Sequence, residues 1–487
     1  MSTDEILGTD WHGKIFTGQW INGSGPAQPV VEAATGNTLG EIGAATVDDA
    51  SAAAARAATA QKAWAKTTPA ERAVILRRAG DLWTEHTAEI ASWIVREAGS
   101  IPAKADLELG YAAQSCYEAA ALPSHPMGQV LPSNEPHWSF SRRVPAGVVT
   151  VIAPFNFPLV LAIRSVAPAL ALGNAVLLKP DPRTAVSGGV ALAKIFAEAG
   201  LPAGVLQVLP GGGDVGAALV EAPEVSVISF TGSTAAGRKV GESAGRLLKR
   251  CHLELGGNNA LIVLPGADVA ASASAGAFGS WMHQGQICMT TGRHLVHESI
   301  YDDYVDALTA KAQALPVGNP ATEEVALGPI IDDRQRTHVR EIIGKAEADG
   351  ARLAAGGAGE GAFVPPTVLA DLTPTNPAWT QEIFGPVAPV ARFSTLEEAA
   401  ELVNASEYGL SLGILGDLGM ALDLVDLIDT GKIHMNEQTV ADEGTVPFGG
   451  TKDSGNGSRV GGAEANIESF TEVQWITMRS QIAPYPF

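Results

Sequence analysis

The sequence predicts an α/β protein organised around a doubly wound parallel sheet. From Gly147 onward, short apolar runs alternate with helical stretches of about 10 to 15 residues, which is the pattern of parallel strands joined by crossover helices. Hydrophobic residues make up 46% of the 487 residues and charged residues 17%, so the chain can build large buried cores. A chain of this length predicts about three domains rather than one.

The first third of the chain is expected to be helical and to serve as scaffold. Residues 48–66 (DDASAAAARAATAQKAWAK) consist mainly of strong helix formers. The next helix should begin at Pro69, because Thr68 is a suitable N-cap and Glu71 completes a capping box with it.

The central region carries four predicted strands, at 148–153, 175–180, 204–210 and 225–230. A helix is expected over 186–200, since glycine and proline follow its last turn. The strands lead into turn residues, as the strands of a doubly wound sheet do.

A second alternating region begins near Asn259 and continues to about residue 435, which predicts another α/β domain. The tail at 469–478 alternates polar and apolar residues like an exposed strand. An exposed terminal strand usually pairs with another strand, which a partner subunit could provide.

Composition excludes several classes of function. The 32 Lys and Arg against 53 Asp and Glu give a net charge of −21, and such a surface without a dense basic cluster repels nucleic acid. The longest apolar stretch, 144–163, is interrupted by Pro145, Pro154 and Pro158, whereas a membrane helix needs about 20 uninterrupted apolar residues. The first residues, MSTDEILGTD, are acidic and unlike a secretory signal. We therefore expect a cytoplasmic protein with neither a membrane nor a nucleic-acid partner.

Two strand–turn–helix junctions are candidates for phosphate binding. Residues 211–216 (GGGDVG) match G-x-G-x-x-G after a strand, a spacing that lets backbone N–H groups approach a pyrophosphate. Residues 230–237 (FTGSTAAG) repeat the arrangement. An ordinary glycine-rich turn remains the alternative for the first junction, because no Asp or Glu follows it by about 20 residues to bind a ribose.

Lys179 ends an apolar strand and precedes Pro180. From the carboxyl end of a strand its ammonium group would point into the crevice where cofactors bind, and could donate to ribose hydroxyls or phosphate. The alternative is an ordinary surface lysine.

The three cysteines are too few for a disulfide framework, and none forms a C-x-x-C pair, so no metal site is expected. Cys116 lies in an alanine-rich helix and Cys251 is expected at a helix end, and we interpret both as inert. Cys288 follows the polar sequence HQGQI and is the candidate nucleophile. His283 is five residues before it, which on a helix is neither the same face nor contact distance, so a Cys–His pair is not expected.

Glu254 and Asn156 are further candidates. Glu254 stands between two leucines and before two glycines, and partial desolvation there favours a general base; a solvated glutamate at a helix end is the alternative. Asn156 lies between two phenylalanines and before Pro158, where its amide could stabilise an oxyanion. Spacing alone does not show that these groups converge.

Seven motifs, in order along the chain, resemble those of the NAD(P)-dependent aldehyde dehydrogenases. They are PFNFP at 154–158, LLKP at 177–180, FTGSTAAG at 230–237, LELGG at 253–257, GQIC at 285–288, EIFGP at 382–386 and PFGGTKDSG at 447–455. The chain length also agrees with that of the family.

The resemblance implies catalytic roles for three residues. Cys288 would be the nucleophile, Glu254 the general base, and Asn156, with the backbone N–H of Cys288, the oxyanion hole. The thiolate would attack the aldehyde, hydride would pass to the nicotinamide, and water activated by Glu254 would hydrolyse the thioester to a carboxylic acid. CoA-acylating relatives typically lack that base, so its presence favours hydrolysis.

The resemblance also implies a cofactor site for NAD, with NADP possible. Lys179 would bind the adenosine ribose, Glu382 the nicotinamide ribose, and Phe384 would lie against the nicotinamide side. The glycine turns beside the cofactor would contribute Gly211, Gly213, Phe230, Gly232, Ser233 and Gly237. Many NAD-preferring members carry a glutamate three residues after the lysine, where this chain has Pro182, so strict NAD preference is not expected.

By family architecture, residues 1–125 and 148–254 would form the NAD(P)-binding domain and residues 255–467 the catalytic domain. Residues 126–147 and 468–487 would form an oligomerisation segment, in which a hairpin pairs with the C-terminal strand. The active unit would be a homodimer or homotetramer.

Within the family, the sequences at 154–189 and 283–289 look most like the benzaldehyde, salicylaldehyde and vanillin dehydrogenases, which favours an aromatic aldehyde as substrate. Arg164 lies in an apolar run and either forms a structural ion pair or reaches the substrate and binds ring oxygens, while Phe157 and loop 438–446 hold the ring. An aliphatic semialdehyde dehydrogenase and a non-catalytic structural protein with this fold are the alternatives. The second should lack a catalytic residue, and this chain lacks none.

Overall fold

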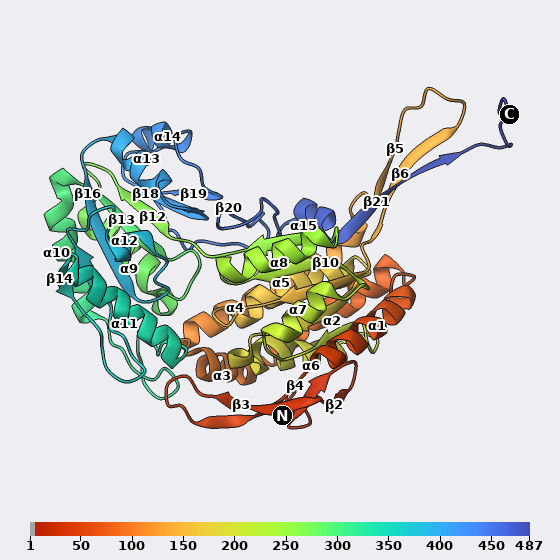
Figure 1. Ribbon diagram of the computed structural model, residues 1–487, viewed down its shortest axis with the longest axis horizontal. Helices are drawn as coiled ribbons and strands as arrows, with labels where there is room; N and C mark the ends of the chain where they lie inside the picture. Colours follow the sequence, from red (N-terminus) through yellow and green to blue (C-terminus); the bar gives the residue numbers. More distant parts are fainter. Residues whose placement is uncertain (1–4) are drawn as a thin grey trace.

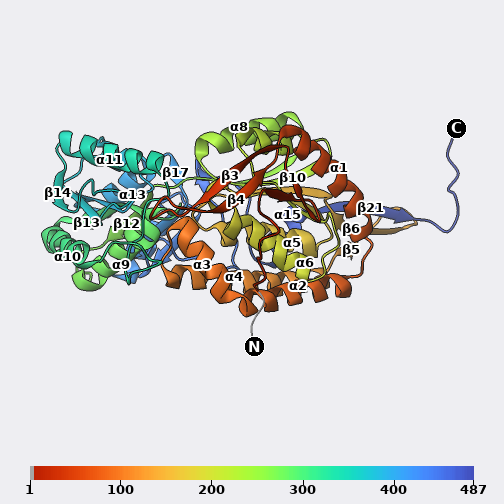
Figure 2. The same cartoon turned by 90° about the horizontal axis from the view of Figure 1, so that it is seen from below.

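The computed structural model describes residues 5–487, in which two seven-stranded sheets lie beside each other along the long axis of the molecule (Figures 1 and 2). The order in the first sheet is β11-β10-β7-β8-β9-β1-β2, with β7 to β11 parallel and β1 antiparallel to both of its neighbours. Its strands are β1 (Lys14–Phe16), β2 (Trp20–Asn22), β7 (Val148–Ile152), β8 (Ala175–Lys179), β9 (Leu206–Val208), β10 (Val225–Thr231) and β11 (Arg250–Glu254).

Helices cover both faces of this sheet, because successive strand residues point to opposite sides. Val148 and Leu177 pack with α1, α7 and α8, whereas Val149 and Leu178 pack with α2 to α6. The helices are α1 (Val47–Trp64), α2 (Pro69–Glu85), α3 (Thr87–Ala98), α4 (Pro102–Ala121), α5 (Pro158–Ala171), α6 (Ala191–Glu198), α7 (Gly213–Glu221) and α8 (Thr234–Arg246). The predicted doubly wound parallel sheet is confirmed.

The second sheet has the order β14-β15-β16-β13-β12-β18-β19 and is parallel except for β14. Helices α9 and α10 pack on one face and α11 to α14 on the other. The strands are β12 (Asn259–Val263), β13 (Thr291–His297), β14 (Arg352–Ala355), β15 (Thr367–Ala370), β16 (Val387–Phe393), β18 (Ser411–Leu415) and β19 (Lys432–Met435). The helices are α9 (Val269–Trp281), α10 (Tyr301–Ala314), α11 (Asp333–Ala348), α12 (Pro377–Thr380), α13 (Leu396–Asn404) and α14 (Leu418–Val425).

A three-stranded arm projects from the end of the molecule (Figures 1 and 2). The predicted C-terminal strand is β21, and it pairs antiparallel with β6 from Thr471↔Pro145 to Met478↔Trp138. The arm and the remaining small elements are β5 (Gly128–Val130), β6 (Trp138–Pro145), β21 (Thr471–Met478), α15 (Ala463–Phe470), β3 (Gly25–Val31), β4 (Thr38–Ala44), β17 (Tyr408–Gly409) and β20 (Thr451–Lys452).

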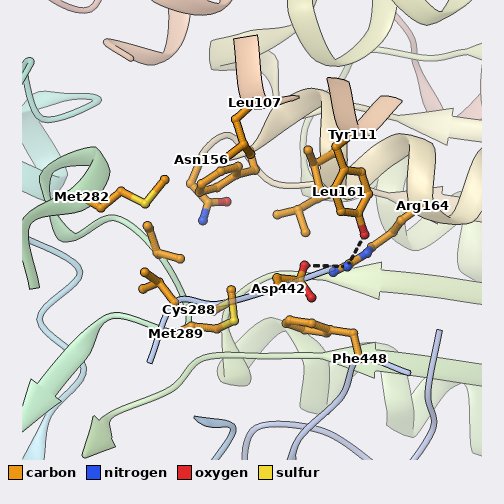
Figure 3. A pocket seen from close by; sticks show the side chains of 14 residues that line it. Leu107, Tyr111, Asn156, Leu161, Arg164, Met282, Cys288, Met289, Asp442 and Phe448 are labelled. Carbon is orange, nitrogen blue, oxygen red and sulfur yellow. Dashed lines mark hydrogen bonds and ion pairs between the residues drawn. The ribbon is translucent and has the colours of Figure 1, made fainter. Parts of the chain in front are cut away.

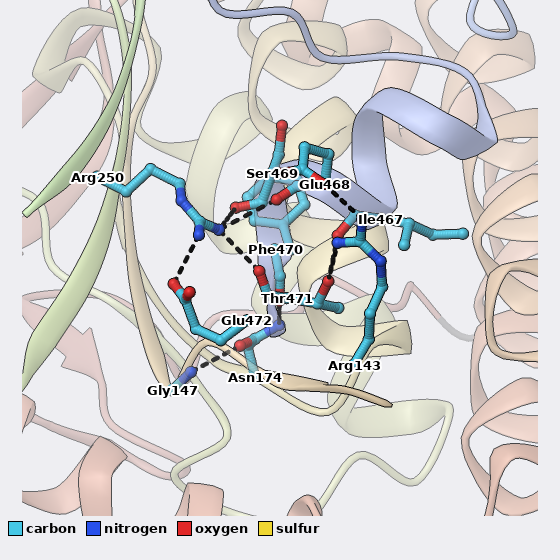
Figure 4. Close-up of polar contacts among 10 residues, drawn as sticks. All are labelled: Arg143, Gly147, Asn174, Arg250, Ile467, Glu468, Ser469, Phe470, Thr471 and Glu472. Atoms are coloured by element: carbon cyan, nitrogen blue, oxygen red, sulfur yellow. Dashed lines mark hydrogen bonds and ion pairs between the residues drawn. The ribbon is translucent and has the colours of Figure 1, made fainter. Parts of the chain in front are cut away.

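Polar contacts fasten the root of the arm to the first sheet (Figure 4). The Arg250 guanidinium donates to the carbonyls of Glu468, Ser469 and Thr471 at 2.9–3.1 Å. On the other side, the Asn174 amide donates to the carbonyl of Phe470 at 3.0 Å. The arm therefore leaves the body at a fixed position.

Local predictions agree with the structure in some places and differ in others. Thr68 caps α2 in the expected capping box. The segment expected as one helix over 186–200 begins instead with a π-helical turn, Val186–Val190, whose first N–H groups donate to the buried Glu97 carboxylate. Cys251 lies on β11, not at a helix end, because 250–254 adds a parallel strand beside β10.

Among residues 5–487 no helix combines the length and the apolar character that crossing a membrane requires. The domain boundaries given above remain a prediction.

Candidate active site

A cavity of about 90 Å³ lies between α4, α5 and the loops that carry Cys288 and Phe448 (Figure 3). Its lining is mostly apolar and consists of Leu107, Tyr111, Asn156, Phe157, Val160, Leu161, Arg164, Met282, Ile287, Cys288, Met289, Val440, Asp442 and Phe448. Four of the residues singled out from the sequence, Asn156, Phe157, Arg164 and Cys288, therefore share one cavity. Loop 438–446 contributes to it through Val440 and Asp442.

The loop that presents Cys288 is held in an unusual backbone conformation. His283 and Gln284 have φ values of 47° and 56°, in a region that non-glycine residues rarely adopt. The Gln284 amide donates to the carbonyls of Gly99 and Pro329, at 2.7 and 2.9 Å, and so keeps the turn in place. Asn259 donates to the carbonyl of Cys288 at 2.8 Å. The thiol thus stands on a braced loop at the cavity wall.

His283 makes no hydrogen bond with the Cys288 thiol among the described residues. Its ring packs edge-on against Phe157, with centroids 5.6 Å apart, and neither of its nitrogens has a partner within the described residues. Burial, with Lys104 nearby, lowers its pKa well below the ordinary value, so it stays neutral. This agrees with the expectation that no Cys–His pair forms.

Asn156 follows β7 and is positioned by a buried ion pair. The Lys104 ammonium donates to the backbone carbonyl of Asn156 at 2.6 Å and to Glu108 at 2.5 Å. The other Glu108 oxygen accepts the N–H groups of Leu159 and Val160, at 3.0 and 3.2 Å, and so caps α5. The Asn156 side-chain oxygen has no partner among residues 5–487. The backbone is therefore fixed and the amide is left available.

Glu254 ends β11 and is 5% exposed. It does not line the cavity, but its charge acts on the Cys288 thiol, whose pKa it raises. Burial raises the pKa of Glu254 itself to about 8, against the opposing charges of Arg164, Arg459 and Lys432. One of its oxygens is buried without a partner in the described chain. A carboxyl group in this state can exchange a proton near neutral pH.

The Cys288 thiol is protonated in this state of the protein. Burial raises its pKa to about 12, and Glu382 and Glu254 raise it further, while Lys432 and Arg164 lower it. The backbone N–H of Cys288 donates to no other group in residues 5–487. Both the thiol and this N–H are therefore free to act on a ligand.

The carboxyl ends of β8, β9 and β10 form the edge where the glycine-rich turns lie. The chain passes from β7 to β8 and β9 on one side and to β10 and β11 on the other, a switch point at which α/β sheets bind ligands. Gly211 lies between β9 and α7, Gly213 is the first residue of α7, and a Cβ on Gly216 would lie 3.4 Å from the Lys179 side chain. Lys179 and the start of α7 are thus neighbours.

Helix α8 begins at the same edge. Ser233 caps it by accepting the N–H of Ala236 at 3.4 Å, and the N–H of Gly232 donates to the Glu254 carbonyl at 3.0 Å. A Cβ on Gly237 would collide with the Leu255 side chain, and Phe230 is buried beneath. These contacts explain why serine stands at 233 and glycine at 237, and they bring the turn before α8 close to Glu254.

The Lys179 ammonium provides a test of whether a dinucleotide fits this edge. It is largely buried, yet its one hydrogen bond within the described residues is a 3.4 Å contact with the Pro180 carbonyl. Burial lowers its pKa, while Asp181 and Asp214 raise it. Ribose hydroxyls would supply the missing acceptors, so the residues present fit the cofactor that the motifs imply.

Glu382 and Phe384 precede β16 and reach the site from the second sheet. The Glu382 carboxylate accepts the N–H of Gly257 at 2.9 Å, and burial raises its pKa to about 7. Phe384 has a φ of 52°, and its ring meets Phe155 edge-on with centroids 5.8 Å apart. The candidate site therefore lies between the two sheets.

Arg164 lines the cavity and also forms an ion pair, while its binding of a substrate stays a prediction. Its Nη2 donates to the Tyr111 hydroxyl at 2.7 Å and to Asp442 at 2.8 Å (Figure 3). Its Nε has no partner within the described chain. The guanidinium carbon lies 4.4 Å from the centre of the Phe448 ring.

The family model for the aldehyde dehydrogenase family matches residues 20–476. The chain belongs to the aldehyde dehydrogenase family. It is similar to a vanillin dehydrogenase of Amycolatopsis sp., with 64% identity, and to the benzaldehyde dehydrogenase [NAD(+)] of Pseudomonas putida, with 47% identity; each match covers 98% of both chains. It is also similar to the crystal structure of a salicylaldehyde dehydrogenase from Pseudomonas putida G7 complexed with salicylaldehyde, with a TM-score of 0.92 and 35% identity over 97% of this chain and 99% of that one.

The predicted family, fold and enzyme class are thereby confirmed. In this aldehyde dehydrogenase, sequence reasoning missed four charged residues near the cavity, of which Lys104 and Glu108 are buried and Lys432 and Asp442 are partly buried. The spacing of Lys104 and Glu108, four residues apart in a helix, was a signal for a pair. Nothing local marks Lys432, whose partners lie elsewhere in the chain.

Proposed function

We propose that this aldehyde dehydrogenase oxidises an aromatic aldehyde to the carboxylic acid, with NAD as the preferred cofactor. The observation that carries the proposal is the cavity beside Cys288, which is apolar except for Asn156 and the group Arg164, Tyr111 and Asp442. Its volume of about 90 Å³ is of the same order as cavities of roughly 150 Å³ that hold benzene. The names of the similar enzymes, vanillin, benzaldehyde and salicylaldehyde dehydrogenase, support a ring-bearing substrate.

Three residues are proposed to perform the chemistry. The Cys288 thiol gives up its proton to solvent, its sulfur attacks the aldehyde carbon, and the Asn156 amide and the Cys288 N–H donate to the oxygen, which becomes negatively charged. Lys179 and Glu382 would hold the two riboses of NAD, and the nicotinamide would supply the hydride acceptor when the cofactor is bound. Glu254 then takes a proton from the water that hydrolyses the thioester, and the acid leaves.

The proposal is tested with a panel of aromatic and aliphatic aldehydes. We expect kcat/KM to be at least about tenfold higher for benzaldehydes than for aliphatic semialdehydes, because the ring buries more apolar surface in this cavity. Preferred turnover of aliphatic semialdehydes would instead favour the alternative function. In the same panel, Arg164→Leu should weaken hydroxylated benzaldehydes more than benzaldehyde by about 10- to 100-fold, since charge-assisted hydrogen bonds contribute about 1.5–3 kcal/mol.

The control for Arg164→Leu is a double variant, Arg164→Leu with Asp442→Leu. Removing the arginine alone leaves the Asp442 carboxylate without its partner. An unpaired buried charge destabilises a protein, whether or not the arginine has a catalytic role. The double variant removes both charges of this pair; because Asp442 also faces Lys432 at 4.0 Å, Asp442→Leu alone is measured beside it. If both variants weaken benzaldehyde and hydroxybenzaldehyde equally, Arg164 has only a structural role.

Cofactor choice depends on Pro182, which places no carboxylate where it would repel a 2′-phosphate. We expect NADP to be used, with NAD preferred. Arg183, the nearest arginine, is already bound to Asp181 at 2.8 Å and Asp332 at 2.6 Å, and so does not attract the phosphate strongly. Pro182→Glu should lower kcat/KM for NADP by like-charge repulsion and leave the value for NAD within a few-fold. A wild-type enzyme that does not use NADP would contradict the argument.

The proposed active unit is a homodimer or homotetramer assembled through the arm. Large apolar side chains are exposed on it, with Val130 at 76%, Trp138 at 67% and Trp475 at 69%. Exposed apolar surface of this kind marks an interface. We also place the enzyme in the cytoplasm, a reducing compartment, because Cys116, Cys251 and Cys288 are all unpaired.

A further inference from the structure

Two cations and a single carboxylate surround the Phe448 ring at the polar end of the cavity. The Arg164 guanidinium carbon lies 4.4 Å and the Lys432 ammonium 4.2 Å from the ring centre. Asp442 contacts Arg164 through one oxygen at 2.8 Å and faces Lys432 through the other at 4.0 Å. Its second oxygen has no hydrogen-bond partner in residues 5–487. One carboxylate thus serves two cations.

Lys432 is the cation that the proposed mechanism does not use. It begins β19, its side chain is 10% exposed, and it lies behind Met289 in the cavity wall. Its ammonium group contacts the Met289 sulfur at 2.7 Å and the Ala441 carbonyl at 3.1 Å, and both are neutral groups. A buried ammonium ion is costly unless a negative charge compensates it. The single negative charge of Asp442 is shared between Arg164 and Lys432, so it compensates the charge of Lys432 only in part.

The other charged groups around this end do not restore the balance. Glu254 has a pKa of about 8 and is largely protonated at neutral pH, and the Cys288 thiol is also neutral. Arg459 adds a further positive charge, since its guanidinium donates to the carbonyls of Gly450 and Ser458. The titratable and charged groups that face this end are Tyr111 from α4, Arg164 from α5, Glu254 from β11, Lys432 and His434 from β19, and Cys288, Asp442 and Arg459 from loops.

We propose that the cavity binds ring-hydroxylated aromatic aldehydes as phenolates, and that Lys432 is a specificity-determining residue that supplies the balancing charge. The inference rests on the proposed function. A hydroxyl group conjugated with a formyl group is a stronger acid than an ordinary phenol, because the carbonyl delocalises the negative charge. Its ionisation in a positively charged pocket therefore costs little. The donor to the phenolate oxygen is the hydroxyl of Tyr111, which lines the cavity, accepts from Arg164 and keeps its own proton to donate.

The test reads the ionisation of the ligand directly. The inactive Cys288→Ala protein is mixed with 4-hydroxybenzaldehyde, whose phenolate absorbs at longer wavelength than the phenol, and the bound spectrum is recorded over a range of pH. We expect the bound phenol to ionise at least one pH unit lower than the free compound. Introducing Lys432→Met into this protein should remove most of that shift, while Lys432→Arg should keep it, because arginine preserves the charge. Lys345→Met, on the exposed face of α11, is the matched control and should change nothing.

Kinetics of the active enzyme give a second readout. Lys432→Met should raise KM for 4-hydroxybenzaldehyde by about tenfold and leave KM for 4-methoxybenzaldehyde, which cannot ionise, within twofold. A bound spectrum of the neutral phenol in the Cys288→Ala protein would overturn the proposal. So would equal losses on the two substrates in Lys432→Met, which would mark a structural lysine. If the wild type does not oxidise 4-methoxybenzaldehyde at all, the proposed function is wrong. That outcome differs from the two above, which would contradict only the binding of a phenolate.

Discussion

Cys288→Ala is expected to abolish oxidation of every aldehyde. We expect kcat to fall by a factor on the order of 10⁴ to 10⁶. No other thiol can replace it. Cys116 is fully buried in α4 and Cys251 lies on β11, and burial raises the pKa of each to about 12. Only Cys288 lines the cavity, where Asn156 can stabilise the oxyanion. The measurement is the formation of reduced cofactor with benzaldehyde as substrate.

Two matched controls separate this chemistry from a general effect of removing a thiol. Cys116→Ala and Cys251→Ala should keep turnover within a few-fold of the wild type, although the first opens a small cavity in a packed helix and should lower the melting temperature. The Cys288→Ala protein should unfold at nearly the wild-type temperature, because the wild-type thiol makes no hydrogen bond with any group in residues 5–487. Residual turnover above a few per cent in Cys288→Ala would remove Cys288 from the nucleophile's role.

The sequence predicted the fold because its signals are local. Apolar runs such as 148–153 and 225–230 end in turn residues, and these runs became β7 and β10 of the parallel sheet. The exposed tail was recognised by its alternation and became β21. Cys251 was misplaced because its short strand lies at the edge of the sheet, where pairing with β10 rather than local propensity decides the conformation.

The candidate site was only partly predictable, for a physical reason. Cys288, Asn156 and Glu254 stand in motifs that can be read along the chain. Asp442 contacts Arg164 and Lys432 contacts Met289, and these partners are far away in sequence, so no local pattern encodes the contacts. The ion pair formed by Arg164 is a second contact that the sequence could not specify. The sequence predicted that the guanidinium needs a partner, but only the fold shows that the partner also faces the cavity.

Glu254→Gln is expected to separate the two halves of the reaction. The neutral amide cannot take a proton from water, so thioester hydrolysis should slow by about 10² to 10⁴-fold, the usual contribution of a general base. Acylation does not need that proton transfer and should be affected much less. Mixing enzyme, NAD and benzaldehyde should then give a rapid burst of one reduced cofactor per active site, followed by slow turnover.

The pH dependence makes the expectation more specific. Because burial raises the pKa of Glu254 to about 8, the carboxylate form of the wild type increases as the pH rises through that value. Hydrolysis should therefore accelerate as the pH rises through about 8, where the rate is half-maximal, and level off about one pH unit higher, and this step should be missing in Glu254→Gln. Glu221→Gln, on the exposed face of α7, is the matched control and should keep both the step and the steady-state rate. If Glu254→Gln turns over at the wild-type rate without a burst, another group activates the water, and the roles assigned to this cavity must be redistributed.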